Sequence, residues 1–211
     1  MAVLCEKLNL LYIEMPRTGC TAVANFFREF HEASRIETEV IERHVSLTEF
    51  QELFPLDASS FVKVVGVRNP FDSLVSQYHK IKDFYSLGKS QWMFQFDDLV
   101  RLAKWAGETN PSFDEVLFHP DAERWMCLDQ DIANEVVAGD YDFLMRFESL
   151  NHEMDNLTDQ LGSKKKWPLQ RYNTTKKRNS LSNYRDYYTT TSRDMTHKRY
   201  HAYLQATGYK F

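Results

Sequence analysis

The sequence contains few of the residues that characterise disulfide-rich, fibrous or disordered proteins. Its three cysteines are widely spaced and form no CxxC pair, so neither a disulfide framework nor a zinc site is expected. Seven glycines and six prolines in 211 residues are too few for a fibrous or disordered chain. The 43% of hydrophobic residues is enough for one substantial core, and we expect a single domain over residues 1–211.

The sequence also lacks a long apolar run. No segment has the roughly 20 consecutive apolar residues that a membrane-spanning helix needs. No apolar stretch follows a basic segment at the N-terminus, as it does in a secretion signal. These absences predict a cytoplasmic protein with no membrane partner.

A surplus of positive charge is missing too. The chain has 26 lysines and arginines against 30 aspartates and glutamates, which gives a net charge of −4. Nucleic-acid-binding domains usually carry a basic surplus, so we expect no nucleic-acid partner. A small anionic ligand remains compatible with this charge, because a few arginines, lysines and backbone N–H groups are enough to bind it.

The first half of the chain contains two buried strands, each followed by a short turn and an amphipathic helix. Residues 8–14 (LNLLYIE) are an apolar run typical of a buried strand, and apolar residues then recur at helical spacing from position 23. Residues 61–67 (FVKVVGV) form the second run. Asn69 suits the N-cap of the following helix and Pro70 suits its first turn.

The remaining pattern is mainly helical. The further elements expected are a capping box at residues 46–49, helices over residues 91–128 with a break at 110–111, a short strand at 141–147, a helix closed by Gly162, and a last helix over 191–207. Strands that alternate with helices predict an α/β fold with a mainly parallel sheet. Ligands of such sheets bind beyond the carboxyl ends of the strands, where Arg17 and Arg68 both stand.

The turn after the first strand, residues 16–21 (PRTGCT), has the composition of an anion site. A helix that begins near Cys20 directs unpaired N–H groups and a partial positive charge toward the turn. Gly19 lets a phosphate approach the backbone, and the hydroxyls of Thr18 and Thr21 are further donors. The turn is not a Walker A loop, because the second glycine and the lysine are absent. Taken alone, it is equally compatible with a plain strand–helix turn.

The segment after the second strand, residues 68–78 (RNPFDSLVSQY), is a second candidate. The planar guanidinium of Arg68 matches phosphate oxygens, and Ser76, two turns into the helix, adds a neutral donor. The alternative is that Arg68 pairs with Asp72 and that Ser76 is merely exposed.

Together these segments resemble the sulfotransferases that use 3′-phosphoadenosine 5′-phosphosulfate (PAPS). That family has a 5′-phosphosulfate loop similar to PKTGGT and a 3′-phosphate motif similar to RNPxDxxxSxY. The sequence carries the whole second motif, and then RFESL at 146–150, YRDYY at 184–188 and GYKF at 208–211, in the family's order. The resemblance extends over nearly the whole chain.

The resemblance implies a P-loop-kinase-like sheet flanked by helices, with PAPS as sulfuryl donor and 3′-phosphoadenosine 5′-phosphate (PAP) as product. Arg68 and Ser76 would bind the 3′-phosphate. The 5′-phosphate would be bound by the backbone N–H groups of Thr18, Gly19, Cys20, Thr21 and Ala22. The basic residues Lys176, Lys177 and Arg178 fall where related enzymes close over the cofactor, although a solvated charge run is an equal alternative.

Arg17 departs from the family pattern, since most members carry lysine there. Arginine is also a cation and a phosphate ligand, but it does not give up a proton at ordinary pH. We therefore expect Arg17 to stabilise the leaving phosphate electrostatically. Cys20 also replaces a more usual glycine or serine, a change that is compatible with binding through the backbone.

His44 is the candidate general base. It stands in RHVS, which is similar to the HVS segment of the heparan sulfate 2-O-sulfotransferases, where the histidine is the base. A surface histidine near a helix start is the alternative, and His79 and Glu14 are further candidates. No metal is expected, because no cluster of residues has ligand spacing.

Two other functions are compatible with parts of the pattern. One is a metabolite kinase with a P-loop-like fold, and the other is a non-catalytic PAP- or PAPS-binding module. The glycine-rich RKG-type segment of steroid and phenol sulfotransferases is absent, which favours the carbohydrate-modifying branch. The acceptor is then a carbohydrate or small-molecule hydroxyl; the sequence does not indicate an oligomeric state.

Overall fold

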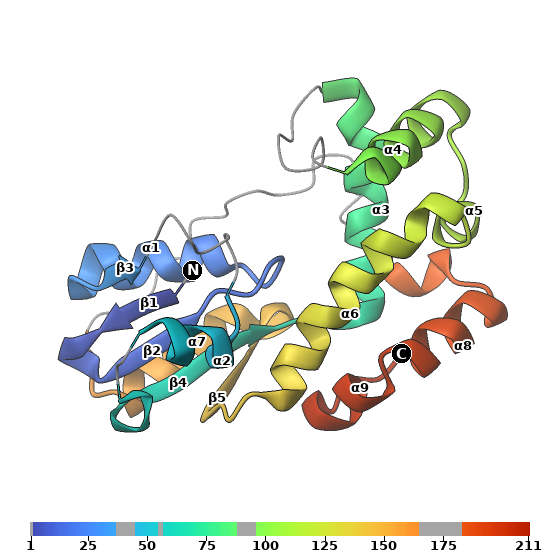
Figure 1. Ribbon diagram of the computed structural model, residues 1–211. Coiled ribbons are helices and arrows are strands. Elements are labelled where there is room, and N and C mark those ends of the chain that lie inside the picture. The colour runs from blue at the N-terminus through green and yellow to red at the C-terminus, as the bar shows by residue number, and fades with distance from the viewer. Residues whose placement is uncertain (1, 37–44, 55–56, 88–95, 165–182) are drawn as a thin grey trace. The chain divides into compact units, whose positions relative to one another are not determined.

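The computed structural model describes residues 2–36, 45–54, 57–87, 96–164 and 183–211 (Figure 1). Two compact units can be distinguished. The sheet unit comprises Met1–Arg68 and Asn134–Asn173, and the helical unit comprises Asn69–Ala133 and Thr174–Phe211. The chain passes from the first to the second between Arg68 and Asn69. The single domain over residues 1–211 stays a prediction.

The sheet unit contains a five-stranded sheet in the order β3-β1-β2-β4-β5 (Figure 1). Its strands are β1 (Ala2–Cys5), β2 (Leu10–Ile13), β3 (Ser34–Ile36), β4 (Val62–Val67) and β5 (Phe143–Arg146). β2 pairs in parallel with β4, and β4 with β5, which confirms the predicted parallel sheet and its three predicted strands. β1 pairs antiparallel with β2 and β3.

The antiparallel edge was not predicted from the sequence. Its strands have only four and three residues, too few to show a periodicity. The chain turns back from β1 to β2 through a 3₁₀ turn at Glu6–Leu8 and through Asn9, which is left-handed with φ 46°. Asparagine tolerates this conformation better than most residues, so the reversal needs no glycine.

One face of the sheet is covered by α1 (Cys20–His31) and α7 (Leu150–Gln160). Alternate strand residues such as Tyr12 and Val64 share a core with Phe27 of α1 and Met154 of α7. The predicted stripe of α1 is therefore its buried face. Gly162 follows α7 with φ 68°, which confirms the predicted C-terminal glycine.

α2 (Leu47–Leu53) begins with the predicted capping box. The Ser46 hydroxyl accepts from the Glu49 N–H at 3.0 Å, and the Ser46 N–H donates to the Glu49 carboxylate at 2.8 Å. This helix also belongs to the sheet unit.

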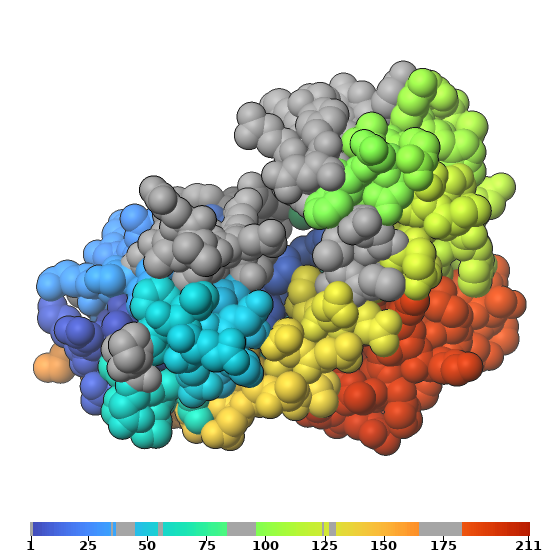
Figure 2. All heavy atoms as spheres, in the orientation of Figure 1, coloured from blue at the N-terminus to red at the C-terminus, as the bar shows by residue number. Residues whose placement is uncertain are grey.

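The helical unit contains α3 (Pro70–Leu87), α4 (Asp97–Thr109), α5 (Phe113–Leu117), α6 (Glu123–Ala138, of which the last residues belong to the sheet unit), α8 (Thr190–Arg199) and α9 (His201–Thr207). Single 3₁₀ turns lie at Pro120–Ala122 and Tyr184–Tyr187 in this unit, and at Ala58–Ser60 and Phe147–Ser149 in the sheet unit. The predicted break at 110–111 is confirmed, and the last predicted helix is divided in two at Tyr200. Within this unit α8 lies beside α6, where Arg199 bonds to Glu123 and Gln130 (Figure 2).

None of the helices in the described ranges is long and apolar enough to cross a membrane.

Candidate phosphate-binding site

The loop between β2 and α1 has a sharply turned backbone. Arg17 and Gly19 are both left-handed, with φ 67° and 77°. This conformation is free for glycine but costs a residue such as arginine about 1–2 kcal/mol. The Gly19 carbonyl accepts from the N–H groups of Ala22 and Val23 at 2.9 and 3.2 Å, so Gly19 is the N-cap of α1.

Several amide groups of this loop have no backbone acceptor. Among the described residues, no backbone hydrogen bond uses the N–H of Thr18, Gly19 or Thr21. They stand at the positive end of a 12-residue helix, an arrangement that favours binding of an anion. The amide of Ala22 is already engaged with Gly19, so it is the weakest of the predicted amide donors.

The Thr18 side chain has a different role from the one expected. Its hydroxyl is buried and donates to the Met15 carbonyl at 2.8 Å, so its single hydrogen is used inside the loop. The expectation that this hydroxyl donates to a phosphate is therefore corrected.

Thr18 is enclosed by two residues of the sheet. A Cβ atom on Gly66 of β4 would stand 2.3 Å from the Thr18 hydroxyl oxygen and 3.3 Å from the Tyr12 hydroxyl, so only glycine fits there. The Tyr12 hydroxyl is fully buried, and this burial raises the pKa of Tyr12 well above its ordinary value. The close contact between loop and sheet holds the loop in one conformation.

Gly19 is packed as closely from the other side. A Cβ atom at this position would lie 2.7 Å from a terminal methyl carbon of Leu150 and 3.5 Å from the ring of Phe147. Both residues belong to the RFESL segment that follows β5. The segment thus supports the loop from β5, the strand on the far side of β4.

Arg68 connects the second candidate segment to the first. It follows β4, as the loop follows β2, and the parallel register pairs Ile13 with Val65. One guanidinium nitrogen of Arg68 donates to the Arg17 carbonyl at 3.1 Å. The guanidinium also lies 4.3 Å from the centre of the Phe147 ring, a favourable cation–π contact.

The helical unit holds the rest of the RNP motif, and Asn69 connects three segments there. Its side-chain oxygen accepts from the Phe71 N–H at 3.0 Å, which caps α3 as predicted. Its side-chain nitrogen donates to the Lys210 carbonyl at 3.0 Å and to the Tyr184 hydroxyl at 3.3 Å. The start of α3 is therefore bonded to the YRDYY and GYKF segments.

Aromatic rings complete this junction. The Tyr188 hydroxyl donates to the Phe71 carbonyl at 3.0 Å. The rings of Phe71, Tyr188 and Phe211 pack edge to face, with centroids 4.9 to 5.5 Å apart. These contacts pack the start of α3 against the YRDYY and GYKF segments.

Ser76 lies on the buried part of α3. It is only 4% exposed, so the alternative of a merely exposed serine is wrong. Within the described residues its hydroxyl makes no hydrogen bond. Arg68 closes the sheet unit and Ser76 belongs to the helical unit; their joint binding of one phosphate stays a prediction.

Four predicted site residues, His44, Lys176, Lys177 and Arg178, lie outside the described residues. The other two candidate bases, Glu14 and His79, lie within the described residues. Glu14 is 1% exposed and directly follows β2. His79 is half-buried on α3, and one of its ring nitrogens lies 2.9 Å from the Tyr187 hydroxyl.

The sequence does not indicate the contacts of Phe147, Leu150, Tyr184 and Lys210. Each lies in a motif that carried the family resemblance, but nothing in the spacing shows which residue it touches. Their contacts with Arg68, Gly19 and Asn69 depend on tertiary structure.

Gly19→Ala is expected to destabilise the protein more than Gly162→Ala. The two glycines have similar φ angles, 77° and 68°, so the backbone strain is similar, but no described residue lies within 4 Å of a Cβ at Gly162. The contact with the terminal methyl of the buried Leu150 side chain should add about 1 kcal/mol for Gly19→Ala, at the lower end of the cost of overpacking. Urea unfolding of both variants measures the difference, and equal losses would contradict the close packing of the loop.

Asn69→Ala is expected to lower the free energy of unfolding by about 1–3 kcal/mol, because it removes a helix cap and leaves the Lys210 carbonyl without its donor. Asn183→Ala is the matched control, since Asn183 is an exposed asparagine that caps the short turn Tyr184–Tyr187. Chemical denaturation compares the two. A loss no larger than that of the control would remove the role assigned to Asn69.

A comparison with protein families identifies this architecture. The sequence model described as "Sulfotransferase family" matches residues 1–207. Comparisons with curated proteins and with solved structures find no match. The match includes the loop at Arg17, Arg68 with its contacts, Asn69, and the RFESL and YRDYY segments, while the GYKF segment at 208–211 follows the matched residues. The chain therefore belongs to the sulfotransferase family.

Proposed function

We propose that this chain transfers the sulfuryl group of PAPS to a hydroxyl of a carbohydrate or small metabolite and releases PAP. The observation that carries the proposal is the loop at Arg17. Among the described residues, three of its amides at the N-terminus of α1 donate no backbone hydrogen bond, and the Arg17 carbonyl accepts from Arg68 at 3.1 Å. Membership of the sulfotransferase family supports sulfuryl transfer in general. The choice of PAPS as donor rests on the motifs at residues 16–21 and 68–78.

The residues fit the two ends of such a donor. The amides of Thr18, Gly19 and Thr21 suit a 5′-phosphate, because a helix N-terminus stabilises negative charge. Arg68 and Ser76 would bind the 3′-phosphate, and this contact would distinguish PAPS from ATP. Lys176, Lys177 and Arg178 would close over the bound nucleotide.

PAPS would supply the sulfuryl group and the leaving phosphate. Arg17 would stabilise the negative charge that develops on the phosphate oxygen as its bond to sulfur breaks. The acceptor oxygen forms the new bond to sulfur, and His44 takes the proton of the acceptor hydroxyl. A positioned base typically contributes about 10²–10⁴-fold in rate.

Ser76→Ala and Arg68→Ala are expected to weaken the binding of PAP selectively. Loss of a hydrogen bond to a charged group costs about 1.5–3 kcal/mol, so we expect roughly a 10- to 100-fold loss for Arg68→Ala and a smaller loss for Ser76→Ala. Calorimetric titration with PAP, AMP and ATP measures the dissociation constants of both variants and of the unmodified chain.

AMP is the control ligand, because it lacks the 3′-phosphate. Arg68 also holds the loop through the Arg17 carbonyl, so Arg68→Ala can weaken AMP binding as well. If Ser76→Ala and Arg68→Ala weaken PAP and AMP equally, the assignment of the 3′-phosphate to these residues is wrong. Preference of the unmodified chain for ATP would favour the kinase instead.

His44→Ala is expected to keep PAP binding and to lose at least about 100-fold in transfer rate. Transfer is measured from radiolabelled PAPS to a panel of oligosaccharides and small alcohols. His197→Ala is the matched control, since His197 is exposed on α8, and it should transfer at the original rate. If His44→Ala matches that rate, the base is another residue, and Glu14→Gln and His79→Ala test the two candidates.

A further inference from the structure

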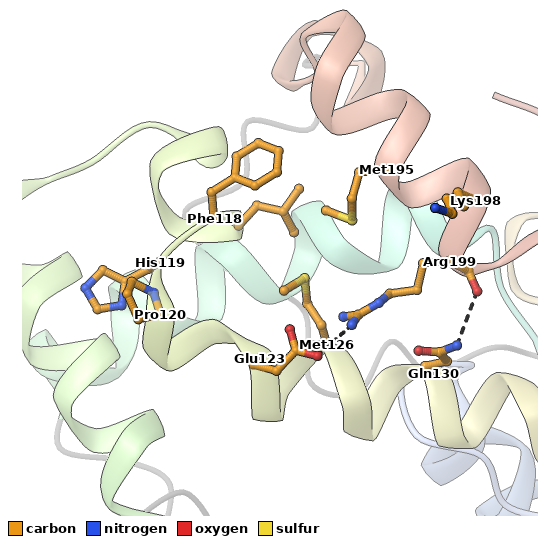
Figure 3. A pocket seen from close by; sticks show the side chains of 10 residues that line it. Phe118, His119, Pro120, Glu123, Met126, Gln130, Met195, Lys198 and Arg199 are labelled. Carbon is orange, nitrogen blue, oxygen red and sulfur yellow. Dashed lines mark hydrogen bonds and ion pairs between the residues drawn. The ribbon is translucent and has the colours of Figure 1, made fainter.

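The helical unit contains a hollow of about 550 Å³ that no step of the proposed reaction uses. It lies between α6 and α8, next to the segment that joins α5 to α6 (Figure 3). All the residues that line it belong to the helical unit. A volume of this size is in the range of small-molecule sites, about 300–1,000 Å³.

The hollow has a marked apolar part. Met126 of α6 and Met195 of α8 point into the space between the two helices (Figure 3). Phe118 stands at the edge and is 48% exposed, although it is a large apolar residue. Methionine side chains are flexible and polarisable, so they adapt to apolar groups of different shape. The apolar part therefore suits a flexible hydrocarbon or an aromatic body.

The ionic part of the lining has an excess of positive charge. Arg199 donates from one guanidinium nitrogen, Nη2, to the Glu123 carboxylate at 2.7 Å. Lys198 is exposed and has no hydrogen bond or ion pair within the described residues. The charges of Lys198, Arg199 and Glu123 sum to one positive charge, in a chain whose net charge is −4.

Arg199 also has an unused donor. Its second terminal nitrogen, Nη1, is buried and makes no hydrogen bond within the described part of the chain. A buried donor without an acceptor is unfavourable, because it has lost its hydrogen bond to water. An anion that draws Nη1 toward itself would remove this cost, while Nη2 keeps its contact with Glu123.

We propose that this pocket binds a small amphiphilic anion. Its apolar body lies against Met126, Met195 and Phe118, and its carboxylate, sulfonate or phosphate group pairs with Lys198 and Arg199. Charge complementarity favours an anion over a cation or a neutral molecule, and the methionines favour a flexible body over a rigid polar one. The proposal concerns binding only and does not depend on sulfuryl transfer.

The test uses the full chain and the fluorescent anion 1-anilinonaphthalene-8-sulfonate, which combines aromatic rings with a sulfonate. Decanoate, decanol and decyltrimethylammonium, each below its micelle concentration, then compete with the probe. We expect decanoate to displace the probe at about one tenth of the concentration that decanol or the cation requires. Equal competition by all three would overturn the proposal, as would no binding of the probe.

Charge reversal locates the site. Lys198→Glu is expected to weaken decanoate binding about tenfold and to leave decanol unchanged. Lys104→Glu is the matched control, because Lys104 is an exposed lysine of the same unit that does not line the pocket. An equal loss of decanoate binding in both variants would show a general charge effect and would overturn the assignment of the anion site to this pocket.

Phe118→Ser tests the apolar part. Because Phe118 is half-exposed, its replacement should leave the fold intact, and it should weaken decanoate and decanol to a similar extent. Unchanged binding of both would overturn the assignment. PAP binding of all these variants is expected to match that of the unmodified chain, so this test and the test of the proposed function fail independently.

Discussion

The parallel pairing of β2 with β4 is the constraint on which the candidate site depends. Because Ile13 lies opposite Val65, both strands end at the same edge of the sheet, and the segments that follow them meet there. The contact between Arg68 and the Arg17 carbonyl follows from this register. β5 pairs with the other side of β4 and brings Phe147 beneath the Arg68 guanidinium. Three segments distant in sequence thus converge at one sheet edge.

Close packing gives the loop its conformation before any ligand is bound. Thr18 is held between its bond to Met15 and the backbone of Gly66, while Gly19 is held by Leu150. These contacts offset the strain of a left-handed Arg17. A site whose donors are already oriented loses less conformational entropy on binding, which is the physical benefit of preorganisation. The same packing explains why the Thr18 hydroxyl is not available to a ligand.

Asn69 holds distant segments together in the helical unit, as the contacts of the loop do in the sheet unit. Its amide is the point where the start of α3, the YRDYY segment and the C-terminal GYKF segment are bonded together. A buried amide has several hydrogen-bonding groups, and here they satisfy a helix N–H and a backbone carbonyl together. The last residues of the chain are therefore part of the support of a motif that begins more than a hundred positions earlier.

Several strands and helix caps of this fold can be predicted from local sequence. The apolar runs at 8–14 and 61–67, the capping box at Ser46 and the cap at Asn69 were predicted correctly, because each depends on neighbouring residues alone. The antiparallel strands, the inward-turned Thr18 and the support by Phe147 and Leu150 were not. Spacing along a chain reports periodicity and caps, whereas these contacts depend on strand order and on the space left between packed elements. The sequence alone determined the family and the two arginine motifs; the tertiary structure alone decided which atoms hold them in place.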